Sequence, residues 1–331
     1  MKKNLLCAVL LTVSSVAQAT PARMAALSGN GGFADDTDFF VYPSVLGGLA
    51  PRTMITYNGG FDGGVIFDDG QALWFERDTV ANDIAAAGPQ GGYRALYAKG
   101  DGASGYLLRA SQTTGLPDAD VGAVSDGVLT LGGAWSSGAG GSNPSNLAIS
   151  GDLSVTGRLN DEPTVGIGAG ITSRNLTQDS MTLWAAGLGY QDDTITLSGG
   201  YTAGPRFRND LSRVALQLGP LGVISINTES ETENIGLTLP ISNLAAEYAL
   251  RDWIRLRGSA TAALFAATTV EDAVDNMAWA AGVGGAFGVG LLHEGARVDM
   301  SINPDWVLSG PQFLSGTPNP LFASVSARVD L

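Results

Sequence analysis

The chain ends on the stretch Leu321-Phe322-Ala323-Ser324-Val325-Ser326-Ala327-Arg328-Val329-Asp330-Leu331, in which apolar and mostly polar residues alternate without a break. Successive side chains of a β-strand point to opposite faces, so this alternation predicts one strand with an apolar face and a polar face. Chain ends usually fray into polar tails, and this one does not. A strand at the end of a chain needs a partner, and in a closed barrel the last strand pairs with the first.

The other end of the chain carries a predicted secretory signal peptide, residues 1–19. Two lysines precede an apolar run over 5–16, and Ala17-Gln18-Ala19 has the small-x-small pattern of a cleavage site. The run is too short for a transmembrane helix. Because the only cysteine, Cys7, lies in this segment, the predicted mature chain has no thiol for a disulfide framework.

The composition indicates many turns and a large surface that does not face water. The chain of 331 residues contains 46 glycines, about twice the usual share, and only 15% charged residues, against about 25% in ordinary soluble domains. The formal net charge is −14, and Lys99 is the only lysine outside the predicted signal peptide. This acidity argues against a nucleic-acid partner, which would require clustered lysine and arginine.

Two pairs of segments predict antiparallel hairpins. In the first, the four-residue turn 191–194 joins two arms that share an apolar face, made of Trp184, Ala186, Leu188, Tyr190, Ile195, Leu197, Gly199 and Tyr201. In the second, 243–250 and 253–265 match their faces if Leu250-Arg251-Asp252 forms the loop. That loop places Glu247 opposite Arg255 as a cross-strand ion pair.

Similar segments, separated by Gly, Asp and Asn clusters, run almost continuously to the end of the chain. The candidate strands are 52–58, 63–68, 71–77, 92–99, 103–111, 126–136, 146–159, 164–172, 181–190, 194–203, 211–218, 222–228, 233–240, 243–250, 253–265, 277–286, 294–302 and 321–331. We expect some short candidates to be two halves of one kinked strand. The length then fits about 12 to 16 strands, and we favour about 14.

A soluble secreted β-sandwich has the same alternation, with its apolar face on a second sheet. Aromatic residues near the predicted strand ends favour a membrane barrel, where they form girdles at the interfaces; they are Trp184, Tyr190, Tyr201, Trp253, Trp279 and Trp306. The apolar faces also lack the large residues of a two-sheet core. We therefore predict an all-β fold: a transmembrane antiparallel β-barrel over residues 52–331, in contact with lipid and lipopolysaccharide of a bacterial outer membrane.

One long apolar segment, Ala278 to Leu292, does not fit a simple strand. It contains five glycines. A transmembrane helix is the sharper alternative, but it needs about 20 residues, and glycine is a weak helix former. We expect a glycine-rich strand pair with a tight turn.

Residues 20–51 do not have the pattern of strands. A glycine-rich stretch over 22–32 leads into Phe33-Ala34-Asp35-Asp36-Thr37-Asp38 and then Phe39-Phe40-Val41-Tyr42-Pro43-Ser44. Here the chain resembles the long-chain fatty-acid transporter superfamily of outer-membrane barrels, which includes the barrel family associated with type IX secretion. Tyr42-Pro43-Ser44 stands where that superfamily has Asn-Pro-Ala, and the loop Gly310–Gly316 has the character of its relatives. The resemblance implies a fourteen-stranded barrel whose N-terminal segment folds inside as a hatch, and which moves hydrophobic small molecules. It carries over no individual ligand-binding residue.

Physical reasoning also favours a hatch, because irregular backbone in a membrane protein is tolerated only where it is buried in protein or lines water. We expect Asp35, Asp36 and Asp38 to anchor the segment through backbone amides or luminal arginines. One alternative is a calcium loop, although the glycine and glutamate positions of a dedicated site are missing. The other is a periplasmic leader that stays outside the barrel.

Charged residues on the polar faces are the candidates for lining the lumen: Glu247, Arg255, Arg257, Arg297, Asp299 and Arg328. They either form ion-pair ladders that hold the barrel together or lie along a permeation path. Acidic clusters at Asp192-Asp193, around Glu231 and around Asp272 either bridge to lipopolysaccharide through divalent ions or are solvated turns.

The sequence predicts no enzyme, cofactor or metal site. His293 is the only histidine, no G-x-S-x-G motif is present, and paired histidine or cysteine ligands are missing. We expect passive passage of small, hydrophobic solutes through the barrel. The alternatives are a closed scaffold barrel for a secretion or surface assembly and a soluble secreted β protein.

Overall fold

The computed structural model of the chain describes residues 21–57, 61–79, 91–114, 127–138, 145–157, 164–177, 179–191, 194–227, 233–271, 274–303, 306 and 321–331. The predicted signal peptide, 1–19, lies outside the described residues, as do Asp192-Asp193, Glu231 and Asp272 of the predicted acidic clusters. The N-terminal part of the described chain contains three short helical elements, α2 (Pro21–Ala26), η1 (Asp36–Phe40) and η2 (Pro43–Gly48).

After residue 51, the described chain consists mainly of β-strands. The strands are β1 (Arg52–Tyr57), β2 (Phe61–Ile66), β3 (Gln71–Thr79), β4 (Gly91–Gly100), β5 (Ser104–Thr114), β6 (Gly127–Gly138), β7 (Ser145–Gly157), β8 (Thr164–Leu176), β9 (Ser180–Gln191), β10 (Thr194–Arg208), β11 (Ser212–Asn227), β12 (Glu233–Arg251), β13 (Ile254–Glu271), β14 (Val274–His293), β15 (Ala296–Ile302) and β16 (Phe322–Asp330). None of the described helices is long and apolar enough to cross a membrane.

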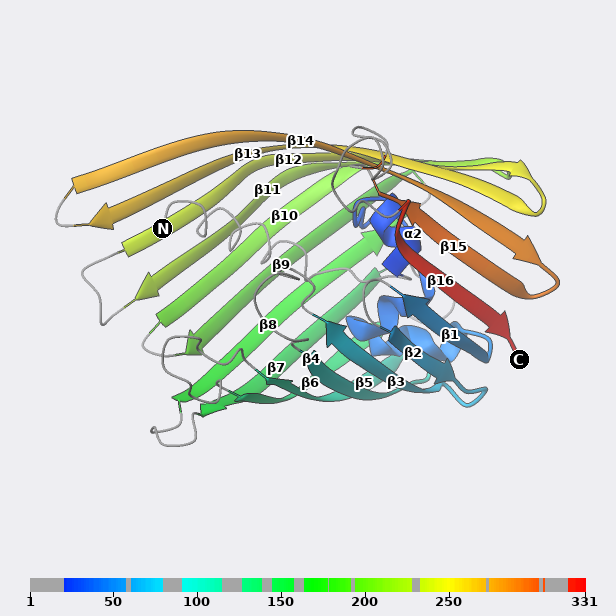
Figure 1. Ribbon diagram of the computed structural model, residues 1–331, viewed down its shortest axis with the longest axis horizontal. Coiled ribbons are helices and arrows are strands. Elements are labelled where there is room, and N and C mark those ends of the chain that lie inside the picture. Colours follow the sequence, from blue (N-terminus) through cyan, green and yellow to red (C-terminus); the bar gives the residue numbers. More distant parts are fainter. Residues whose placement is uncertain are drawn as a thin grey trace.

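The strands form one closed antiparallel barrel in which every strand pairs with its neighbours in sequence (Figure 1). The C-terminal strand β16 closes on β1, in register from Arg52 opposite Asp330 to Tyr57 opposite Val325. The backbone N–H of Leu331 extends this pairing by donating to the carbonyl of Pro51 at 3.0 Å. The strand predicted from the terminal stretch, and its pairing with the first strand, are therefore confirmed.

The barrel has 16 strands, so the preference for about 14 is wrong. The expectation that some short candidates are two halves of one kinked strand is confirmed, because two pairs of candidate segments form the single strands β11 and β12. Strand β12 has one extra residue within 238–242 relative to both of its neighbours, β11 and β13, so the pairing shifts there by one residue on each side. Pro240 lies inside this interval. Proline cannot donate to the ladder, so β12 bulges there and then continues.

The two predicted hairpins have different outcomes. Between β9 and β10 the register is as predicted, with Tyr190 opposite Ile195 and Trp184 opposite Tyr201. Between β12 and β13 the predicted loop is wrong: Asp252-Trp253 joins the strands, and Glu247 lies opposite Arg257 instead of Arg255. The two-residue turn and a one-residue bulge in β12 near Ala249 together shift the pairing by two residues from the predicted register, which leaves each side chain on its predicted face.

The glycine-rich segment Ala278–Leu292 is neither a helix nor a strand pair. It belongs to one strand, β14, which pairs with β13 from Ile254 opposite Leu291 to Glu271 opposite Val274. The predicted tight turn is therefore wrong. The long neighbouring strand gives the segment a continuous hydrogen-bonding partner that periodicity alone does not reveal.

The two faces of the sheet differ in character. In β1, Arg52, Met54 and Thr56 are buried, whereas Ile55 and Tyr57 are each 51% exposed. Large apolar side chains are exposed on the same outward face around the barrel, including Phe75, Leu108, Leu131, Ile167, Leu188, Tyr201 and Tyr248. Of the predicted girdle residues, Trp184, Tyr190, Tyr201 and Trp253 are exposed, and the side chain of Trp279 lies outside the described residues. This apolar-out arrangement is typical of barrels that span outer membranes.

The two ends of the barrel also differ. One end, here called the short-turn end, carries the connections 67–70, 101–103, 209–211, 252–253 and 294–295, together with the start of β1 and the end of β16. The ends of β3, β5 and β15, which precede the three longest connections in the sequence, are all at the opposite end. In outer-membrane barrels the short turns are periplasmic and the longer loops extracellular.

The N-terminal segment, residues 21–50, packs against the inward face of the strands near the short-turn end (Figure 1). Phe39 and Leu46 belong to one buried apolar cluster with Trp74 and other residues of β1 to β5. Met24, Leu27 and Phe33 belong to a second cluster with Met181, Ala215 and Ala245. Between the two clusters the contacts are polar, and they make up the candidate site.

Candidate functional site

The site begins with the aspartate-rich stretch of the N-terminal segment. Asp35 is the N-cap of η1 and accepts a hydrogen bond from the backbone N–H of Asp36, while Asp38 accepts one from the N–H of Asp35 at 2.9 Å. This reciprocal arrangement is a capping box, which satisfies amides at the start of a helix. Two of the predicted aspartates thus fix the local backbone.

Each of the three aspartates also reaches an arginine. Asp35 pairs with Arg23 of α2, which lies in the same segment. Asp36 pairs with Arg52 of β1 at 2.7 Å and with Arg328 of β16. Asp38 receives a 2.7 Å hydrogen bond from Arg174 of β8. Ion pairs therefore connect the segment to strands on both sides of the barrel. Among the described residues, no group of three or more possible ligands is placed to hold a metal ion.

Glu247 lies at the centre of a buried ion network. It accepts from Nε of Arg23 at 3.1 Å and from Nε of Arg257 at 2.7 Å, and Nη2 of Arg297 is 3.8 Å away. Asp299 lies 2.8 Å from Nη1 of Arg257 and also pairs with Arg297. The side chain of Arg257 is fully buried, and Glu247 and Asp299 compensate its positive charge.

Arg23 is the link between the segment and this network. Burial alone would lower the pKa of its guanidinium, but the attraction of Asp35 and Glu247 outweighs burial and raises the pKa above its ordinary value. Arg23 therefore stays charged and holds the two carboxylates together.

The predicted luminal residues are thus mostly brought together. Glu247, Arg257, Arg297 and Asp299 form the network, and Arg328 joins the segment through Asp36. Arg255 stands apart from these ion pairs but lines the same cavity. That cavity, of about 290 Å³, lies between the segment and the wall and is lined by Arg23, Ala34, Asp35, Asp36, Arg213, Glu247, Arg255, Leu292 and Arg297.

Sequence reasoning missed Arg23, Arg52 and Arg174, the partners of the three aspartates. Arg23 is the only basic residue of the N-terminal segment, which is a usable signal next to a run of aspartates. Arg52 and Arg174 face inward by strand alternation, but periodicity does not show which inward residue the segment reaches.

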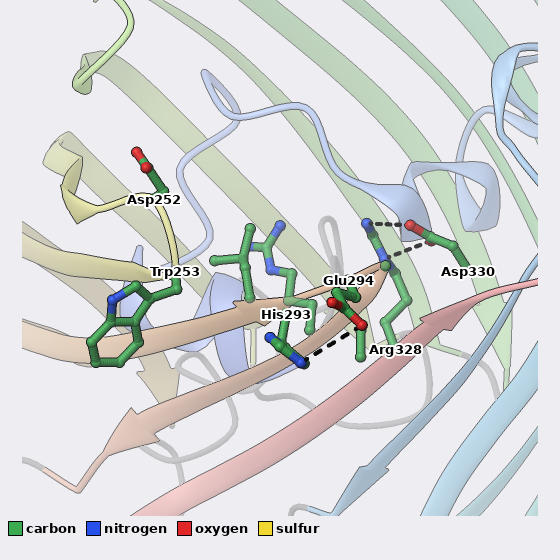
Figure 2. Close-up of a pocket in the computed structure, with 10 residues that line it drawn as sticks. Asp252, Trp253, His293, Glu294, Arg328 and Asp330 are labelled. Carbon is green, nitrogen blue, oxygen red and sulfur yellow. Dashed lines mark hydrogen bonds and ion pairs between the residues drawn. The ribbon is translucent and has the colours of Figure 1, made fainter.

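A second pocket, of about 390 Å³, opens at the short-turn end between the turns 252–253 and 294–295. Figure 2 shows Arg328 and Asp330 facing each other in it, with His293 beside Glu294. His293 ends β14 and its side chain is 84% exposed, 3.9 Å from the carboxylate of Glu294. No other titratable partner of the imidazole is found among the described residues.

The strand topology defines a closed sixteen-stranded β-barrel of the outer-membrane type. No protein-family model and no curated protein matches the chain. Among solved structures, it is similar to OmpT (in-vitro folded), an outer membrane protein of Vibrio cholerae, with a TM-score of 0.36 and 9% identity over 84% of this chain and 94% of that chain. A likeness at this level identifies no function, and the fatty-acid transporter resemblance has no support from these comparisons.

Proposed function

We propose that the chain is a bacterial outer-membrane barrel for passive passage of small solutes, and that its N-terminal segment is a hatch that closes the lumen at rest. The exposed apolar outward face supports the membrane location, because so large an apolar surface is unfavourable in water. Closure of the barrel also leaves no strand edge to be satisfied within lipid.

The observation that carries the hatch is the spread of its contacts around the wall. Ser44 is hydrogen-bonded to Ser136 of β6, Asp38 to Arg174 of β8, Ser28 to Ser259 of β13, and the N–H of Ala22 to Ser326 of β16. A segment that touches strands on all sides of a ring obstructs the opening at that level.

The character of the solute follows from the space that the segment leaves. The cavity of about 290 Å³ beside Glu247 is lined almost entirely by charged side chains. A hydrophobic solute would have to displace water from these groups without replacing their hydrogen bonds. The cavity therefore favours a polar solute over the hydrophobic one that the resemblance implies.

A closed scaffold barrel is the second candidate, and the two apolar clusters favour it. Phe39 and Leu46 on one side, and Leu27 and Phe33 on the other, are at most 3% exposed. Burial of such side chains holds the segment in place by about 1.5 to 3 kcal/mol each. In this alternative the segment never moves.

Locking the segment to the wall separates the two candidates. Ser44→Cys/Ser136→Cys replaces a pair whose hydroxyl oxygens are 2.9 Å apart and creates a cross-link in a mature chain without other thiols. The matched control, Ser301→Cys/Ser324→Cys, joins two wall strands through oxygens 3.0 Å apart and leaves the segment free. Uptake of a small sugar by proteoliposomes is measured with each variant oxidised and then reduced.

The hatch predicts uptake that stops when the segment-to-wall pair is oxidised, returns on reduction and is unaffected in the control. Uptake that continues through the locked variant contradicts the hatch, and absence of uptake in every state favours the scaffold. Full solubility of the folded chain without detergent would overturn the membrane location itself.

A further inference from the structure

We infer that the inner wall at the short-turn end carries a binding site for a small anionic solute, a carboxylate or a phosphate, built on Arg213 and Arg255. The identification of this anion as a transported solute rests on the proposed function. The binding site itself consists of wall residues and does not depend on whether the solute passes through the barrel.

The strand register places a group of arginines on the inward face. Residues directly opposite each other in a sheet share a face, and Arg213 lies opposite both Glu247 and Arg208. Arg255 lies opposite Ala249, which is buried like Glu247. Arg206, two residues before Arg208, has the same orientation. We call Arg206, Arg208, Arg213 and Arg255 the inner arginine group.

These four arginines are in excess of the carboxylates that form the neighbouring ion network. The ion network beside them is balanced, with five arginines (Arg23, Arg52, Arg257, Arg297 and Arg328) joined to five acids (Asp35, Asp36, Glu247, Asp299 and Asp330). Within the described part of the chain, no member of the inner arginine group makes an ion pair, and Arg206 donates only to the carbonyl of Thr177 at 2.8 Å. This surplus stands out in a chain whose net charge is −14.

The surplus is costly without an anion. Like charges directly opposite in a sheet are destabilising, and Arg208 and Arg213 are such a pair. The adjacent network also offers an unused donor, because Nη2 of Arg297 is buried and has no hydrogen-bond acceptor among the described residues. A bound anion would accept from these groups and offset the repulsion.

Space for the anion is present at this point. Arg213, Arg255 and Arg297 all line the cavity of about 290 Å³, which would hold on the order of ten waters. The planar guanidinium presents two parallel N–H groups that match a carboxylate or phosphate. Because the inner arginine group faces the lumen, the phosphates of membrane lipids lie on the far side of the wall and do not reach it.

The test is calorimetric titration of the full-length protein, folded in a zwitterionic detergent, with sodium phosphate and separately with sodium acetate at low ionic strength. Arg213→Gln/Arg255→Gln removes both guanidinium groups and their charges. Arg213→Lys/Arg255→Lys keeps the positive charges but lacks the parallel N–H groups of the guanidinium. The matched control is Arg94→Gln, which removes an arginine that is already paired with Glu76 at 2.6 Å. Heat-modifiable migration checks that each variant is folded.

We expect saturable binding that weakens by about tenfold or more in the Gln pair, by less in the Lys pair, and by no more than about twofold in the control. Phosphate and acetate binding compared at equal concentration separates the two anion types. Absence of saturable binding, or an equal loss in all variants, would overturn the site. Because binding is measured without transport, a barrel that binds the anion but passes no solute would contradict only the proposed function.

Discussion

At the scale of single residues, Glu247 links the N-terminal segment to the barrel wall through ion pairs. Among the described residues, it is the one carboxylate that contacts both Arg23 of the segment and Arg257 of β13, and all three side chains are buried. A buried ion pair adds little net stability when complete, but removing one partner leaves a charge without compensation.

We therefore expect Glu247→Gln to destabilise the folded barrel by about 3 kcal/mol, since Arg23 would keep only Asp35, Arg257 would keep only Asp299, and the buried network would be left with one uncompensated positive charge. Guanidinium unfolding in lipid vesicles, followed by tryptophan fluorescence, measures the change. Glu76→Gln is the control, because its partner Arg94 is 43% exposed and such pairs contribute about 1 kcal/mol or less. Equal losses in both variants would refute the central role of Glu247.

Tyr42 gives the segment a dependence on alkaline pH. Burial raises the pKa of its phenol, although a hydrogen bond to Thr172 and the nearby Arg174 oppose the shift. A raised pKa in the folded state means that docking is strongest below the ordinary tyrosine pKa of about 10 and weakens as the pH rises past it. Protection of Arg23 from trypsin should fall in that range, and Tyr42→Phe should abolish the fall; an unchanged profile in Tyr42→Phe would contradict this origin.

At the scale of elements, the segment docks where wall glycines allow it. A Cβ on Gly105 of β5 would lie 2.3 Å from the backbone nitrogen of Ser44, and one on Gly288 of β14 would lie 2.4 Å from the Cβ of Ala26. Neither position leaves room for a side chain while η2 and α2 keep their places. The wall is thus shaped for the segment at two well-separated strands.

Gly105→Ala should consequently loosen η2, at a cost of about 1 to 3 kcal/mol, without opening the barrel. The expected result is faster trypsin cleavage after Arg23 with unchanged heat-modifiable migration. Gly199→Ala is the matched control, because its Cβ would meet nothing closer than 3.7 Å. Equal cleavage rates in both variants would show that the close approach is not needed for docking.

Alternation predicted the elements well because it follows directly from strand geometry. The closing strand, the β9–β10 hairpin and the inward face of Glu247 all come from it. It failed where the deciding contact is not local: the bulge at Pro240, the shifted register near Ala249, and the single strand through Ala278–Leu292. For the same reason, the luminal face of the site residues was predictable but their ion-pair partners were not, since alternation gives the face of a residue and not its partner.

At the scale of the whole molecule, the unequal ends of the barrel predict its orientation. The N-terminal segment lies at the short-turn end, and short turns face the periplasm in outer-membrane barrels. The inner arginine group is at the same end, so the proposed anion site would be on the periplasmic side of the lumen.

Labelling of single cysteines in cells checks this orientation. Asp118→Cys lies in the long connection between β5 and β6, and Glu294→Cys lies in a two-residue turn at the short-turn end. A membrane-impermeant maleimide should react with the first in intact cells and with the second only after the outer membrane is permeabilised. The reverse pattern would invert the orientation.

The central claim is that residues 21–50 are docked on the inner wall of a closed barrel, and cysteine cross-linking measures this most directly. In purified, folded full-length protein, Ser28→Cys/Ser259→Cys and Ser44→Cys/Ser136→Cys should each form a disulfide under mild oxidation, because the native oxygens are 2.6 Å and 2.9 Å apart. The mismatched pair Ser28→Cys/Ser136→Cys should form none. Disulfides in the two matched pairs and none in the mismatched pair would support the docked segment. Equal cross-linking of all three pairs, or of none, would contradict it.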